Sequence, residues 1–144
     1  MKVSLDPQDY RDLADFRFQL RQFLHFSELQ AKEHNLEPQQ HQALLAIKGL
    51  PAGTKPTIGE LAQRLLLRHH SAVELTDRLE AAGLIRRKHA EDDRRQTLIY
   101  LTARGAARLR ALSMVHRDEL AVKGPQLVRA LRSAVRTSRR SHTS

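Results

Sequence analysis

The sequence predicts a mostly α-helical fold with about six helices and one small β-hairpin. Three observations support this prediction. Apolar residues recur at helical spacing along most of the chain, proline and glycine residues separate the helical segments, and two β-prone runs flank the charged segment EDDRRQ at residues 91–96. The hairpin follows the fourth predicted helix and precedes the fifth.

The composition of the chain is that of a single globular domain. Its 144 residues are 40% hydrophobic, which is enough for one core and too much for a disordered chain. No apolar run approaches the ~18 residues of a membrane span. The N-terminal stretch MKVSLDPQDY lacks the apolar centre of a secretory signal, so we expect a cytoplasmic protein. Because cysteine is absent, disulfides, thiol switches and cysteine-ligated zinc are excluded.

The formal net charge of +9 favours a polyanionic partner, nucleic acid first and acidic lipid second. The excess charge lies near the C-terminus. Residues 104–144 hold ten Lys and Arg residues against only Asp118 and Glu119, whereas residues 1–103 are nearly balanced. The total charge therefore does not locate a nucleic-acid site by itself.

Residues 9–33 predict the first helix, and its apolar face is broader than one core contact requires. Leu13, Phe16, Leu20 and Phe23 follow helical spacing, and all four phenylalanines of the protein lie in this helix. The helix either forms the centre of a monomer core or packs on its own domain and on a second subunit. We favour the second interpretation, because no other segment of so small a domain could cover the remaining apolar residues.

Proline, glycine and threonine mark the ends of the next two predicted helices. The second begins at Pro38, where a missing N–H costs nothing, and ends at Gly49. Thr57 caps the third helix, and Glu60 three residues later completes a predicted capping box. The core-facing residues predicted on these two helices are Leu44, Leu45, Ile47, Ile58, Leu61, Ala62 and Leu65.

The fourth predicted helix runs from His69 to Ala82 and ends at Gly83. Its inward-facing residues are Ala72, Leu75, Thr76 and Leu79, and its outward-facing residues are His69, His70, Ser71, Val73, Glu74, Asp77 and Arg78. Residues 84–88 and 97–101 then predict the two strands of a hairpin. Helix, turn, helix and hairpin in this order form a winged helix-turn-helix, a DNA-reading structure.

The last third of the chain predicts two further helices. Thr102 caps the fifth, which runs to about Val122, and Gly124-Pro125 is expected to separate it from a sixth. Residues 138–144, SRRSHTS, predict a frayed basic tail. The arginines of the sixth helix either contact DNA phosphates or keep an exposed helix soluble; they include Arg129, Arg132 and Arg136.

The exposed side of the fourth helix carries groups that can read the major groove. His69, His70 and Ser71 can hydrogen-bond to bases or phosphates, Val73 can contact a thymine methyl, and Glu74 can accept a hydrogen bond from cytosine N4. The segment 68–82 has a net charge of −1, so the hairpin must supply most of the attraction to phosphates. Its basic residues are Arg86, Arg87, Lys88, Arg94 and Arg95. The competing interpretation is that the helix residues are merely solvated and that EDDRR is a self-neutralising turn.

Two segments resemble the MarR family of bacterial transcription regulators. IGELAQRLLLRHHSAVELTDRLEAAGLI is similar to the family's helix-turn-recognition-helix. EDDRRQTLIYLTARG resembles its wing signature, in which D-R-R precedes a strand that ends in L-T-x-x-G. The predicted order of helices and hairpin also fits the family over nearly the whole chain. The sequence departs from the family pattern at Leu66 in the turn, at Arg68 at the helix cap, and at Glu74, where relatives often have a basic residue.

The resemblance implies a single MarR-like domain that forms an obligate homodimer on a pseudo-palindromic operator, usually as a repressor released by a small, often aromatic ligand. The dimerisation region would be residues 9–36 and 103–140, and the winged helix-turn-helix residues 38–102. It also implies that one tip arginine, for which we favour Arg95, enters the minor groove, while Asp93 fixes the turn by pairing with a nearby arginine. The expected DNA-contacting residues are Arg68, His69, His70, Ser71, Val73, Glu74, Arg78, Arg86, Arg94, Arg95 and Gln96.

A ligand pocket is expected where the first, second and fifth helices meet the reading domain, although aromatic residues at helical spacing more often form a core. No cofactor is predicted, and the chain has no glycine-rich phosphate loop, nucleophile elbow or HExxH pattern, so we do not expect an enzyme. The alternatives to a ligand-released repressor are a regulator without an effector, a winged-helix protein-interaction module, and a zinc-responsive regulator with His and carboxylate ligands. The candidate pocket residues are Phe16, Phe23, Phe26, His41 and Leu45.

Overall fold

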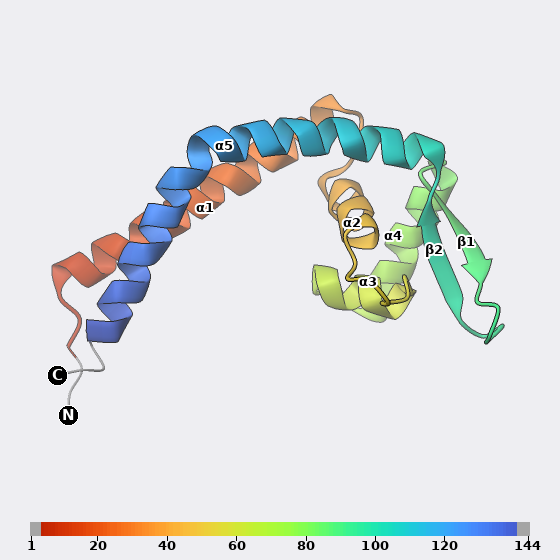
Figure 1. The fold of residues 1–144 in the computed structure, drawn as a ribbon, viewed down its shortest axis with the longest axis horizontal. Helices are drawn as coiled ribbons and strands as arrows, with labels where there is room; N and C mark the ends of the chain where they lie inside the picture. Colours follow the sequence, from red (N-terminus) through yellow and green to blue (C-terminus); the bar gives the residue numbers. More distant parts are fainter. Residues whose placement is uncertain (1–3, 141–144) are drawn as a thin grey trace. The chain divides into compact units, whose positions relative to one another are not determined.

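The computed structural model describes residues 4–140, with side chains described as far as residue 136. Within this range the fold is mostly helical with one antiparallel hairpin between the fourth and fifth helices, so the predicted fold class is confirmed (Figure 1). The elements in order are α1 (Pro7–Glu33), α2 (Pro38–Lys48), α3 (Ile58–Leu65), α4 (His69–Ala81), β1 (Ile85–His89), β2 (Thr97–Leu101) and α5 (Ala103–Arg140).

The predicted fifth and sixth helices form one helix, α5, with Pro125 inside it. The prediction of a break at Gly124-Pro125 was therefore wrong. A proline within a helix removes one backbone hydrogen bond and costs ~3 kcal/mol, which weakens or kinks a helix but need not end it. Leu120 and Leu127, which flank the proline, line the same hollow beside α1. Of the predicted basic tail, residues 138–140 continue α5, and residues 141–144 lie outside the described residues.

The chain divides into two compact units. The winged-helix unit comprises residues 30–113, and the paired-helix unit comprises residues 1–29 and 114–144. The division passes through α1 and α5, so the last turn of α1 and the first part of α5 belong to the unit that contains the hairpin.

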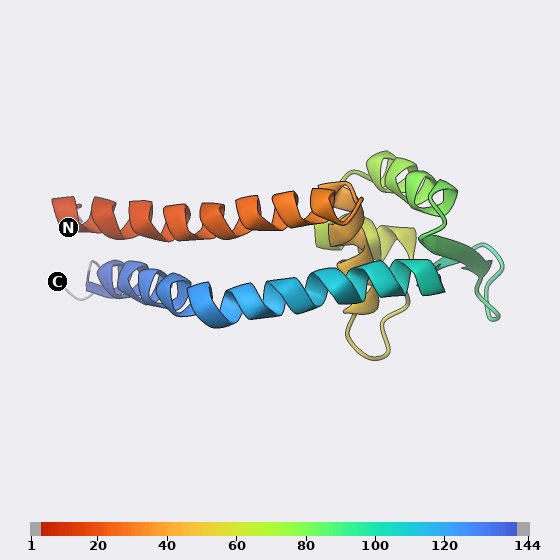
Figure 2. The ribbon, with the colours of Figure 1, turned by 90° about the horizontal axis from the view of Figure 1, so that it is seen from above.

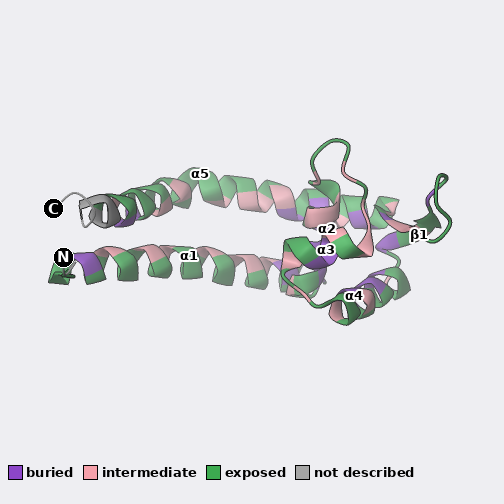
Figure 3. Ribbon diagram, turned by 90° about the horizontal axis from the view of Figure 1, so that it is seen from below, coloured by how far each residue is buried: buried purple, intermediate pink, exposed green. Residues whose placement is uncertain are grey.

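The core of the winged-helix unit is formed by fully buried aliphatic side chains from α2, α4, the hairpin and the start of α5. Figure 3 shows these buried positions on α3, α4 and β1. The four residues predicted to face inward on α4 are all buried. The buried Thr76 hydroxyl has a hydrogen-bond partner, because it donates to the Ala72 carbonyl at 2.6 Å. On α2, Leu44 is fully buried while Leu45 is 50% exposed, so the prediction of Leu45 as a core residue was wrong. One helical step turns a side chain by about 100°, which separates these neighbours.

The hairpin pairs Ile85 with Leu101 and Arg87 with Ile99. The segment before α3 extends this small sheet, because the Ile99 N–H donates to the Pro56 carbonyl at 2.8 Å. Thr57 then caps α3 by accepting a hydrogen bond from the Glu60 N–H at 3.1 Å. Only this half of the predicted capping box is present, since the Glu60 carboxylate pairs with Arg64 instead.

Candidate nucleic-acid interface

The turn between α3 and α4 places a leucine in a conformation that favours glycine. Leu66 has φ 55° and ψ 42°, the left-handed region, and its side chain is 92% exposed. The backbone N–H of Leu67 donates to the Ala62 carbonyl at 2.8 Å and closes the end of α3. The turn therefore forms without the small residue that the resemblance leads one to expect, at a cost of ~1–2 kcal/mol for the leucine backbone.

The outward side of α4 is accessible, as predicted from the sequence. Arg68 is the N-cap residue of α4, although its side chain makes no capping hydrogen bond. This residue, both histidines and Glu74 are exposed, and Ser71 and Val73 are half-buried. Groups that can donate to phosphates or bases thus lie at the start of α4, and the smaller side chains of Ser71 and Val73 follow within the same first turns.

Arg78 behaves differently from the other candidates on α4. Its Nε lies 3.4 Å from a Glu37 carboxylate oxygen, and its Nη2 donates to the Gln39 side-chain oxygen at 3.5 Å. Both partners lie at the start of α2. The guanidinium therefore connects α4 to α2, and the structure gives Arg78 a partner within the protein.

Arg87 is also engaged within the protein. Its Nη2 donates to the Asp77 carboxylate, and its Nε lies 3.7 Å from a Glu80 carboxylate oxygen. Arg87 was predicted to attract DNA together with its neighbours on the first strand. The structure turns its side chain toward α4, where it neutralises acidic residues of the helix.

The opposite face of the hairpin presents basic groups to solvent. Arg86 and Lys88 are exposed there, and the Lys88 ammonium lies 5.8 Å from the centre of the Tyr100 ring. These residues line a hollow of about 590 Å³ together with Lys55 and His89. Strand alternation accounts for the arrangement, because residues 86 and 88 point to one face and residue 87 to the other.

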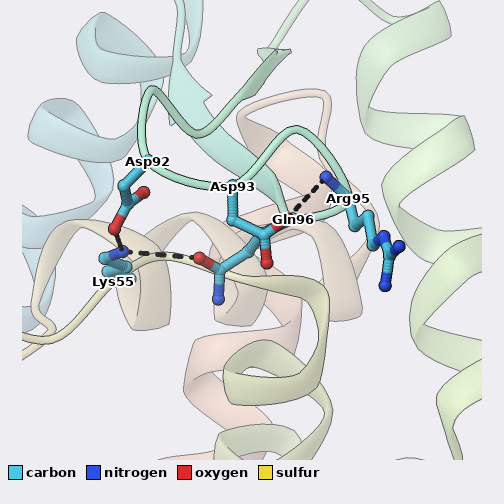
Figure 4. A network of polar contacts seen from close by, with 5 residues as sticks. All are labelled: Lys55, Asp92, Asp93, Arg95 and Gln96. Carbon is cyan, nitrogen blue, oxygen red and sulfur yellow. Dashed lines mark hydrogen bonds and ion pairs between the residues drawn. The ribbon is translucent and has the colours of Figure 1, made fainter.

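The wing tip is a turn ordered by Asp93 (Figure 4). The Asp93 carboxylate accepts a hydrogen bond from the backbone N–H of Arg95 at 3.0 Å, and its carbonyl accepts one from the Gln96 N–H at 3.0 Å. The resemblance implied that Asp93 pairs with an arginine side chain; in the structure its carboxylate instead accepts a hydrogen bond from the backbone N–H of Arg95. Among the described residues no ion pair engages Arg94 or Arg95, and both are exposed.

The wing tip is also connected to the loop before α3. The Lys55 ammonium contacts the Asp92 carboxylate at 2.6 Å and the Gln96 side-chain oxygen at 3.5 Å (Figure 4). The hydrogen bond from Lys55, followed by backbone hydrogen bonding, holds the pKa of the Asp92 carboxyl below its usual value. This contact was not predicted from the sequence, since residues 37 positions apart carry no local signal of pairing.

The base of the hairpin is fixed by a close backbone contact. The Thr102 hydroxyl donates to the Gly83 carbonyl at 2.6 Å and accepts from the Gly105 N–H at 3.1 Å. A Cβ atom on Gly105 would lie 2.0 Å from the Leu84 carbonyl oxygen. The threonine and glycine of the L-T-x-x-G pattern therefore have a structural reason: they let α5 begin against the end of α4.

Comparison with known proteins identifies this arrangement. Residues 34–96 match the sequence profile of the MarR family. The predicted resemblance to the MarR family is confirmed for this segment. The matched residues include all of α2, α3, α4 and β1 and the wing tip. A comparison with curated proteins gave no match.

Several solved structures share the fold. AbsC, a MarR family transcriptional regulator from Streptomyces coelicolor, superposes with a TM-score of 0.71 at 20% identity over 83% of this chain and 80% of its own. A MepR mutant from S. aureus bound to an oligodeoxyribonucleotide gives 0.63 at 20% identity, over 90% and 95%. The transcriptional regulator BldR from Sulfolobus solfataricus gives 0.55 at 26% identity, over 73% and 70%.

The predicted pocket residues are not gathered at one site. Phe23 and Phe26 line a hollow of about 340 Å³ between α1 and α5 in the paired-helix unit, whereas Phe16 is not among its lining residues. In the winged-helix unit, His41 is buried and Leu45 is half-exposed. Within residues 4–140, no cluster of three or more histidine and acidic side chains could hold a metal ion, and no helix is long and apolar enough to cross a membrane.

Proposed function

We propose that this protein is a dimeric, sequence-specific DNA-binding transcription regulator in which α4 lies in the major groove and the wing tip reaches the adjacent minor groove. The observation that carries the proposal is the wing tip: Arg94 and Arg95 are exposed and free of ion pairs within the described residues, on a turn that Asp93 orders. A basic side chain held ready at a turn suits the narrow, negative minor groove. A MepR mutant with a similar fold is bound to an oligodeoxyribonucleotide in its solved structure, which supports DNA as the partner.

The charges of α4 also support DNA binding. The sequence alone assigns this helix a slight negative charge, which opposes binding to phosphates. Asp77 and Glu80 are paired with Arg87, so Glu74 is the one acid of α4 without an ion pair in the described part of the chain. Pairing with Arg87 reduces the negative field of α4 that opposes binding to phosphates. The slight negative charge of α4 was the feature that favoured a protein-interaction module, so this alternative is weakened.

The paired-helix unit supports a homodimer. Its parts of α1 and α5 run alongside each other (Figure 2), and His116 contacts Phe23 and Phe26 at ring-centre distances of 6.0 and 5.6 Å. Two helices that pack only on each other leave the apolar residues on their outer sides exposed. An extended exposed apolar patch of this kind marks a protein–protein interface. We infer that a second copy of the chain covers it. The exposed apolar residues include Leu13, Phe18, Leu20, Leu24, Leu120, Val122, Leu131 and Val135.

A dimer would place two copies of α4 and two wings on one duplex, and its two-fold symmetry would require a pseudo-palindromic operator. We propose that the regulator is a repressor, which acts by occupying the operator. We further propose release by a small ligand, such as an aromatic one, at the hollow between α1 and α5. The hollow has an aromatic wall from Phe23 and Phe26, with His25 and Lys123 as polar groups that can orient a ligand.

Selection of bound sequences from random DNA tests the proposal. The expected result is enrichment of an inverted repeat with half-sites about one helical turn apart, bound by a species of twice the chain mass. No enriched sequence would contradict the proposed function and favour the protein-interaction module. Enrichment of a single half-site by a monomer would contradict the dimer.

A further inference from the structure

Three consecutive basic residues of β1 differ in what their side chains face. Arg86 and Lys88 are exposed and line the outer hollow of the hairpin. Arg87, between them, points to the other face and reaches α4, and its side chain is 26% exposed. The three residues carry the same charge, but Arg86 and Lys88 face solvent whereas Arg87 faces α4.

The contacts of Arg87 form a clamp between the hairpin and α4. One guanidinium meets two carboxylates, those of Asp77 and Glu80. These acids are three residues apart on α4, so they lie on one face of the helix and can share one cation. The Nε of Arg87 is buried and makes no hydrogen bond. The negative charge of the Glu80 carboxylate, 3.7 Å away, therefore compensates the positive charge at this atom. Breaking a partly buried arrangement of this kind leaves uncompensated charges on both elements.

We propose that Arg87 is a positioning residue of the DNA interface: it fixes the hairpin against α4 and neutralises two acids there, and it does not contact DNA. The inference rests on the proposed DNA-binding function. Because α4 and the wing must fit one duplex together, a loose hairpin would have to be ordered at the moment of binding, which lowers affinity. Releasing Asp77 and Glu80 would in addition restore negative charge to the reading helix.

Lys88 provides the matched control, because it is the next residue on the strand and carries the same charge. Affinity for the selected operator is measured for Arg87→Gln and for Lys88→Gln, each alone and combined with Asp77→Asn and Glu80→Gln. Arg87→Gln alone is expected to weaken binding at least tenfold. Adding the two neutralising substitutions should recover at least threefold, because they remove the released acids. In the Lys88→Gln background the same two substitutions break an intact clamp and should give no recovery.

Equal recovery in both backgrounds would mean that only net charge matters, and it would overturn the proposal. Absence of recovery in the Arg87→Gln background would also overturn it, since a direct phosphate contact cannot be replaced by neutralising acids. Urea unfolding of the DNA-free protein provides a second readout. Arg87→Gln and Asp77→Asn should be non-additive there, while Lys88→Gln and Asp77→Asn should be additive; additivity of the first pair would refute the clamp. Failure of the wild-type protein to bind any selected DNA would instead refute the proposed function and leave this unfolding test standing.

Discussion

Replacement of Gly105 by alanine should destabilise the protein, although alanine is the better helix former. The added Cβ would lie 2.0 Å from the Leu84 carbonyl oxygen and 3.0 Å from its carbon. Ordinary contact begins near 3.4 Å, so the backbone must separate by about 1.4 Å at a carbonyl that accepts the Thr102 N–H at 3.0 Å. Overpacking costs ~1–3 kcal/mol and the strained hydrogen bond ~1 kcal/mol. The higher helix propensity of alanine stabilises the variant by ~1 kcal/mol, so the free energy of unfolding should fall by about 2 kcal/mol in total.

Gly59→Ala is the matched control, because Gly59 also lies in the first turn of a helix. Its Cβ would meet only the Thr57 hydroxyl oxygen at 3.9 Å, an ordinary contact, so this variant should gain ~0.5–1 kcal/mol. Both free energies of unfolding are measured by urea denaturation at one protein concentration, because the stability of the proposed dimer would depend on concentration. If Gly105→Ala is as stable as the wild type, the close contact with Leu84 does not restrict this position and the reasoning fails.

Three further predictions concern the turn and the wing. Leu66→Gly should stabilise the protein by up to ~1 kcal/mol in the same urea assay, because it relieves the left-handed leucine while removing an exposed side chain; a less stable variant would contradict this. Arg95→Ala should weaken operator binding at least tenfold in a titration at fixed salt with the dimer intact, and wild-type affinity would exclude the minor-groove role. Lys55→Met should raise the pKa of Asp92 toward its usual value by NMR titration, and no change would show that Lys55 does not hold this carboxylate.

The lowered pKa of Asp92 also sets the direction of a pH effect. Because the carboxyl binds its proton more weakly in the folded state, its contribution to stability is present above the unfolded pKa and is lost as the pH falls through the folded pKa. Both side chains of the pair are largely exposed, so solvent screens the contact and the effect on stability is small. The main consequence of the pair is local: it holds the wing against the loop before α3.

Local patterns in the sequence were sufficient for most elements of the winged-helix unit. The inward face of α4, the Thr57 cap and both strands follow from periodicity and capping, which depend on residues a few positions apart. The break predicted at Pro125 was wrong because a proline removes only one hydrogen bond of a long helix, which weakens the helix without ending it. The pocket was harder to predict, since it depends on which helices lie together rather than on any local pattern.

The role of Arg87 illustrates a signal that was present in the sequence but not used. Summing the charges of the hairpin treats Arg86, Arg87 and Lys88 as equal, whereas the two-residue period of a strand already places Arg87 on the side of Ile85 and Ile99. The ion-pair partners of Arg87 could be identified only from the structure, because Asp77 and Glu80 belong to another element. Charge along a strand is better counted separately for each face.

The hairpin is held at its base and on one face of its first strand, whereas the arginines of its tip make no ion pair in the described part of the chain. Thr102 and Gly105 fix the base against the end of α4, and Arg87 fixes β1 to the same helix. Arg94 and Arg95 project from a turn that is closed by its own backbone and by Asp93. This division suits the proposed binding role, because rigidity near the helix sets the angle of approach without immobilising the side chains that are proposed to contact DNA. Gly105→Ala should therefore weaken operator binding as well as stability, whereas Arg95→Ala should weaken binding alone.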